Sequence, residues 1–176
     1  MMQSPVKKIT TLGLFICIGL LTGYLESFIV LPIGVPGIKI GLSNAITVVS
    51  LYFFGPVFAL IVLFCRVLLS GLLFGSGISI IYSLTGALVS FGGMYLFKKI
   101  SFFSVYGVSI LGGVLNNIAQ LAVASLIVKM PHLIYYLPVL VIAGLIAGFI
   151  VGIISVILIK RLQPVISNTF KGDNNK

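Results

Sequence analysis

The stretch Ile9–Leu31, ITTLGLFICIGLLTGYLESFIVL, decides how this chain is built. It is long enough to cross a membrane, whose hydrocarbon core of about 30 Å takes about 20 apolar residues in a helix. One charged side chain, Glu26, interrupts it. A charge inside a membrane costs about 2.5 kcal/mol or more, and such a residue marks a functional site by default. The stretch therefore predicts both a membrane span and a candidate site residue.

The composition of the whole chain is that of an integral membrane protein. Of its 176 residues 60% are hydrophobic and 7% are charged, with a mean hydropathy of +1.30. Soluble domains are roughly 45–50% apolar and roughly 25% charged. The only carboxylates are Glu26 and Asp173, so the chain lacks the clustered acids or phosphate-binding loop of diphosphate chemistry and ATP hydrolysis. We expect no enzyme activity, no cofactor and no metal site.

Long apolar runs predict an all-α fold with six transmembrane helices in one domain, residues 1–161, followed by a polar cytoplasmic tail, residues 162–176. The second helix is short, and the Pro- and Gly-rich segment 32–37 before it is a candidate lid over a cavity. The predicted spans are 9–31, 40–54, 56–75, 77–97, 101–128 and 136–160.

The positions of lysine and arginine predict the orientation, because cytoplasmic loops are enriched in both. With both termini in the cytoplasm, eight of these residues lie inside, while Lys39 and Lys129 lie outside and Arg66 lies within a span. The net charge of +9 is then a topology signal in a multi-pass protein of the cell membrane, and we expect no nucleic-acid partner. The eight are Lys7, Lys8, Lys98, Lys99, Lys160, Arg161, Lys171 and Lys176.

Small residues indicate where helices can pack closely. Gly144, Gly148 and Gly152 follow one another at four-residue intervals in the last span, which makes a smooth helix face. We expect this face to pack inside the monomer, and a partner interface is the alternative. Gly13 and Cys17 form a weaker pattern of the same kind in the cytoplasmic half of the first span.

Most polar side chains of the predicted spans fall in the outer half of the membrane. A buried polar group without a partner is costly in lipid, so these side chains must face other helices or a polar cavity. Interhelical hydrogen bonds worth about 0.6 kcal/mol each are the structural alternative to ligand binding. The candidate substrate-binding residues are Glu26, Lys39, Asn44, Arg66, Tyr82, Asn116, Asn117 and Gln120.

The charges of these candidates favour an anionic ligand. Arg66 and Lys39 are cationic, and Glu26 is the only acid near enough to balance them. One positive charge remains, which suits a carboxylate or phosphate. In the alternative interpretation Arg66 and Glu26 form a structural pair, and Lys39 extends to the lipid headgroups.

Four motifs give the chain a family resemblance that extends from about residue 7 to 161. They are YLES at residues 24–27, PGIKIGLSN at 36–44, RVLLSGLLFG at 66–75 and NNIAQL at 116–121. Together they resemble the Gx transporter family, also described as heptaprenyl diphosphate synthase component I. Members of that family resemble the substrate-binding S components of energy-coupling factor (ECF) transporters.

This resemblance implies an S-component-like bundle of six helices, with cytoplasmic termini and an outward-facing pocket that the loop after the first helix caps. It also implies an ECF transmembrane scaffold and two cytoplasmic ATPases as partners. Gly13 and Cys17 stand where S components commonly use small residues, usually an alanine pair, to meet the scaffold. The family often has histidine where this chain has Asn116.

We therefore expect a substrate-binding membrane subunit for the uptake of a small anionic nutrient or precursor. The alternative is a non-catalytic membrane anchor for a prenyl-diphosphate synthase or a quinone or redox enzyme. The anchor would use Lys98, Lys99 and the tail from Lys160 onward, and would not need the outer polar residues.

Overall fold

The computed structural model describes residues 5–28, 41–75, 77–100 and 103–171. Every regular element within these ranges is helical, which confirms the predicted all-α class. The elements are α1 (Pro5–Phe28), α2 (Leu42–Phe54), α3 (Pro56–Phe74), α4 (Gly77–Lys99), α5 (Val105–Val128), the 3₁₀ helix η1 (Pro131–Tyr136) and α6 (Leu137–Lys171).

Five of the helices, α1, α3, α4, α5 and α6, are long and apolar enough to cross a membrane. The helix α2 has only 13 residues, which corresponds to about 20 Å of a hydrocarbon core about 30 Å thick. The chain is therefore a multi-pass membrane protein, and the prediction of a short second helix is confirmed.

The last helix extends further than the sequence indicated. The predicted span ends at residue 160, whereas α6 continues to Lys171 with Pro164 inside it. Lys160 and Arg161 mark where the apolar segment stops, but a helix need not end where the membrane ends. Much of the segment predicted as a polar tail is consequently helical.

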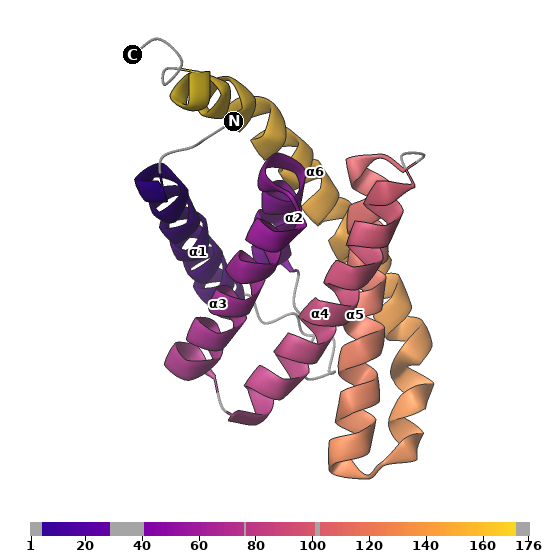
Figure 1. Cartoon of the computed structure of the whole chain (residues 1–176). Helices are drawn as coiled ribbons and strands as arrows, with labels where there is room; N and C mark the ends of the chain where they lie inside the picture. The colour runs from indigo at the N-terminus through magenta and orange to yellow at the C-terminus, as the bar shows by residue number, and fades with distance from the viewer. Residues whose placement is uncertain (1–4, 29–40, 76, 101–102, 172–176) are drawn as a thin grey trace.

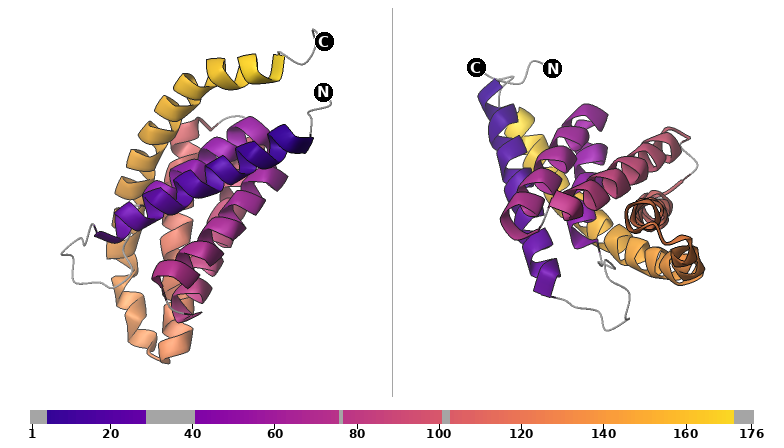
Figure 2. Two further views of the ribbon diagram at one scale, coloured as in Figure 1. Left: turned by 90° about the vertical axis from the view of Figure 1, so that its left-hand side faces the viewer. Right: turned by 90° about the horizontal axis from the view of Figure 1, so that it is seen from below.

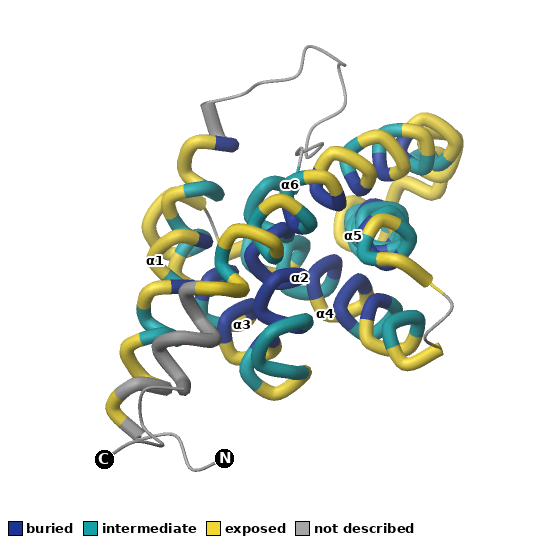
Figure 3. The backbone as a smooth tube through the Cα atoms, turned by 90° about the horizontal axis from the view of Figure 1, so that it is seen from above, coloured by how far each residue is buried: buried dark blue, intermediate teal, exposed yellow. Residues whose placement is uncertain are grey.

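The short helix α2 is the centre of the bundle. It packs against α1, α3 and α6, and Figure 1 shows it with α3 between α1 on one side and α4 and α5 on the other, while α6 extends from the side of α5 toward the start of α1. All of its residues from Ala45 to Leu51 are buried, as Figure 3 shows from above. Two of its polar residues, Thr47 and Ser50, are therefore buried inside the bundle and kept away from lipid.

A core of apolar side chains joins α2 to α3, α4 and α5. Val48 and Leu51 of α2 contact this cluster from the centre. The complete set of buried residues in it is Val48, Leu51, Ala59, Leu63, Val67, Ala87, Phe91, Met94 and Val108.

The start of α1 and the end of α6 lie at the same end of the molecule (Figure 2). An even number of crossings returns a chain to the side from which it started, so this arrangement agrees with six spans. That this end faces the cytoplasm stays a prediction from the lysine and arginine positions.

The glycine face of α6 packs against α5. A Cβ atom on Gly148 would lie 2.6 Å from the Cα atom of Ile110, and one on Gly144 would lie 2.9 Å from the Cα atom of Val114. Contacts this short leave no room for a side chain, so the two backbones touch directly. The expectation that these glycines pack inside the monomer is confirmed.

We predict that Gly148→Ala destabilises the protein by about 1–3 kcal/mol, because the new methyl group collides with the backbone of α5. The matched control is Gly92→Ala on α4, where an added Cβ has nothing within 4 Å and alanine favours the helix. The thermal unfolding midpoint in detergent, followed by circular dichroism, should fall for the first variant and not for the second. Equal midpoints would contradict the close packing of α5 and α6.

Candidate functional site

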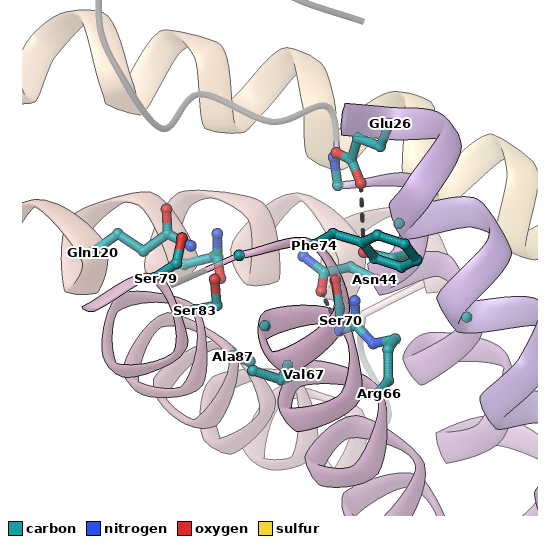
Figure 4. A pocket seen from close by; sticks show the side chains of 17 residues that line it. Glu26, Asn44, Arg66, Val67, Ser70, Phe74, Ser79, Ser83, Ala87 and Gln120 are labelled. Atoms are coloured by element: carbon teal, nitrogen blue, oxygen red, sulfur yellow. Dashed lines mark hydrogen bonds between the residues drawn. The ribbon is translucent and has the colours of Figure 1, made fainter. Parts of the chain in front are cut away.

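Residues of five helices, α1 to α5, line a cavity of about 120 Å³ (Figure 4). Five of the predicted site residues lie in its wall: Glu26, Asn44, Arg66, Asn116 and Gln120. Their separation along the chain is large, and the helix packing brings them to one place. The predicted convergence of polar side chains is therefore present for these five.

Glu26 lies in the last turns of α1, where only 3% of its surface is exposed. Its carboxylate accepts hydrogen bonds from the backbone N–H of Gly41 and, at 3.4 Å, from the hydroxyl of Ser43. Gly41 precedes α2 with a φ of 77°, a left-handed conformation that glycine adopts without strain. The carboxylate thus lies at the positive end of the α2 dipole, which stabilises its charge.

Arg66 lies in the middle of α3 and is 6% exposed. Its Nη2 atom donates to Asn44 Oδ1 at 3.0 Å and to Thr47 Oγ1 at 3.4 Å. Its buried Nε atom has no hydrogen-bond partner among the described residues. Gly19 of α1 makes room for the side chain, because a Cβ atom there would lie 2.8 Å from Arg66 Cδ.

The two charged groups are therefore held by different partners. Glu26 is bonded by the N-terminal end of α2, and Arg66 donates to neutral oxygen atoms of the same helix. The described hydrogen bonds give each group its own structural role, while the charges of Glu26 and Arg66 still act on each other.

Neutral polar side chains line the other end of the cavity. Gln120 lies there with Ser79 and Ser83, while Glu26, Asn44 and Arg66 lie at the opposite end (Figure 4). Gly86 makes room for the two amides of α5, since a Cβ atom there would lie 2.7 Å from Gln120 Cγ and 2.8 Å from Asn116 Oδ1.

The remaining predicted residues lie elsewhere. Asn117 is buried and donates to the Leu140 carbonyl of α6 at 2.9 Å, so its amide joins two helices. Tyr82 is half-buried and is not part of the wall that the described residues form. Lys39 and the predicted lid, 32–37, lie outside the described residues.

The predicted partner face on α1 is accessible. Cys17 is exposed, and a Cβ atom on Gly13 would have nothing within 4 Å among the described residues.

Sequence reasoning missed several small residues of the wall. Ser43, Ser70, Ser79 and Ser83 line the cavity, but single serines are common in membrane helices and draw no attention. The four-residue spacing of Ser79 and Ser83 was an available signal, because it places both on one face of a helix. Gly19 also lines the cavity, but a glycine in a membrane helix indicates close packing rather than a binding site.

We predict that Gly19→Ala displaces the Arg66 side chain from Asn44 and destabilises the protein by about 1–3 kcal/mol. Gly13→Ala on the same helix is the control, because its new methyl group meets open space. Thermal unfolding in detergent measures both effects. The same midpoint for the two variants would show that Arg66 does not depend on the space beside Gly19.

Comparison with known families shows to which family the chain belongs. A family model described as heptaprenyl diphosphate synthase component I matches residues 15–158, which contain every residue that lines the cavity. No curated protein and no solved structure matched. The matched segment is most of the chain and runs from α1 into α6. The chain therefore belongs to the heptaprenyl diphosphate synthase component I family.

Proposed function

We propose that this chain is a substrate-binding subunit that holds a small anionic nutrient or precursor in the cavity between α1 and α5 during its uptake. The observation that carries this proposal is the buried guanidinium of Arg66, whose described partners are neutral oxygen atoms. The charge of Glu26 acts on Arg66, but the Glu26 carboxylate is hydrogen-bonded to the N-terminal end of α2, so the guanidinium has no counter-charge in direct contact among the described residues. A buried charge without such a contact is costly. An anionic ligand would supply one.

The surrounding residues support ligand binding rather than packing alone. A core that serves only stability would bring apolar side chains together, as the cluster around Val48 and Leu51 does. The cavity instead gathers hydroxyls and amides from α3, α4 and α5 around free space. Binding sites for small molecules combine such space with a few convergent polar groups.

Uptake would require energy from another protein. The chain has two carboxylates and no nucleotide-binding loop. The resemblance to S components implies an ECF scaffold with two ATPases, and the accessible Gly13 and Cys17 on α1 would meet that scaffold. In this arrangement both termini face the cytoplasm of the cell, and the cavity opens to the outside.

The family name implies a partner synthase component, which gives a second candidate, a membrane component that works with a soluble heptaprenyl diphosphate synthase. With two carboxylates in the whole sequence, this chain could not itself hold magnesium diphosphate through an aspartate cluster. An anchor would need free basic residues at one end. Lys98 is less available for that role, because its Nζ atom donates to the Leu51 carbonyl at 2.6 Å and lies 4.7 Å from the Tyr52 ring centroid.

Mass spectrometry of small molecules that co-purify with the protein tests the proposal. We expect a compound bound to the unsubstituted protein and reduced about tenfold in the double variant Asn116→Ala, Gln120→Ala, because two hydrogen bonds to the ligand are lost. Tyr82→Phe is the control, since it removes a hydroxyl outside the cavity wall, and this variant should retain the compound.

Equal retention by the double variant would contradict binding in this cavity. Co-purification of a soluble prenyl-diphosphate synthase without a small molecule would favour the second candidate instead.

A further inference from the structure

We infer that the ligand is a compact monocarboxylate whose carboxylate binds Arg66 and whose neutral hydroxyl or amide part faces Gln120, and that the site discriminates against diphosphates. This inference rests on the proposed function and names its substrate class. It draws on the charge, the polarity and the size of the cavity.

The charge of the described wall suits no more than one negative group. Arg66 is the single cation among the described lining residues, and Glu26 is their single acid. The charge of Glu26 acts on Arg66, but the hydrogen bonds of Glu26 go to the N-terminal end of α2, so N–H donors of Arg66 are left for the ligand. A phosphate group carries about −1.5 to −2 charges near neutral pH, so a diphosphate would leave more negative charge unbalanced beside Glu26 than a monocarboxylate.

The donors of Arg66 are available for such a group. A guanidinium has five N–H donors, and the described residues accept two hydrogen bonds from it, both from Nη2. A carboxylate is the natural acceptor for the remaining donors, because charge-assisted hydrogen bonds are about twice as strong as neutral ones.

The polarity of the wall changes across the cavity. The end with Arg66 and Asn44 is charged, whereas Ser79, Ser83 and Gln120 at the other end are neutral groups that form hydrogen bonds (Figure 4). A ligand that fills the cavity would therefore place its anionic group at α3 and a hydroxyl or amide at α4 and α5.

The size of the cavity favours a small ligand over a prenyl chain. Its volume is about 120 Å³, somewhat below the roughly 150 Å³ of an engineered cavity that binds benzene. A second cavity beside it adds only about 20 Å³ and shares Gly41, Asn44 and Asn116 with the first. The space suits a molecule of about the size of lactate, and a long isoprenoid tail would extend beyond it.

A tryptophan reporter can test this inference, because the sequence contains no tryptophan. Phe74 lines the cavity and is half exposed, so Phe74→Trp places a single fluorophore there. Leu72→Trp on the same helix is the control, because residue 72 is exposed and lies outside the described wall. The probes are lactate, its neutral counterpart lactamide, and pyrophosphate, each titrated in a non-ionic detergent.

We expect lactate to quench the fluorescence of the Phe74→Trp variant saturably, with an affinity roughly tenfold or more above that for lactamide and pyrophosphate. The fluorescence of the Leu72→Trp variant should show no saturable change. Adding Arg66→Gln to the Phe74→Trp variant should remove the preference for lactate over lactamide. If that double variant does not fold, the affinities of the three probes for the Phe74→Trp protein still test whether the site prefers a monocarboxylate.

Tighter binding of pyrophosphate than of lactate would overturn the inferred substrate class and leave the cavity as a ligand site. Equal affinities for lactate and lactamide would overturn the role of Arg66. No saturable response to any probe would contradict both the inference and the proposed function.

Discussion

The structure depends on how the two ends of the short central helix α2 are stabilised. A helix has unpaired N–H groups at its N-terminus and unpaired C=O groups at its C-terminus. Its dipole places partial positive charge at the N-terminus and partial negative charge at the C-terminus. Glu26 of α1 accepts the Gly41 N–H at the N-terminal end, and Lys98 of α4 donates to the Leu51 carbonyl near the C-terminal end. Each charge has the sign that the adjoining helix end requires. These contacts allow a 13-residue helix to occupy the middle of the bundle.

The same contacts explain why a cationic group is available in the cavity. If Glu26 were bonded to Arg66, the described wall would contain a satisfied ion pair. Because α2 bonds Glu26, the described hydrogen-bond partners of the guanidinium are Asn44 and Thr47, which are neutral, although the charge of Glu26 still acts on it. The interaction that holds the central helix in place therefore also leaves N–H donors of Arg66 that a ligand could bind.

Much of the fold and part of the site could be predicted from the sequence. Hydropathy locates the spans because lipid requires long apolar segments, and polar residues such as Asn44 and Gln120 could be placed inside the bundle because lipid does not solvate them. The choice between Asn116 and Asn117 could not be made. Either amide can share a helix face with Gln120, and the outcome depends on how α5 is rotated against α6. That rotation follows from backbone contacts such as those of Gly148.

The floor of the cavity has a consequence for permeability. Val67 and Ala87 line the cavity and also belong to the apolar core cluster, which continues through Leu63 and Met94. Such a cluster offers no oxygen atoms to replace the hydration shell of an ion, and hydrophobic constrictions of this kind block conduction. In the described part of the chain the cavity is therefore a pocket with a sealed base. Material held in it could reach the opposite side only if helices move, so the proposed uptake would not make the protein an ion leak.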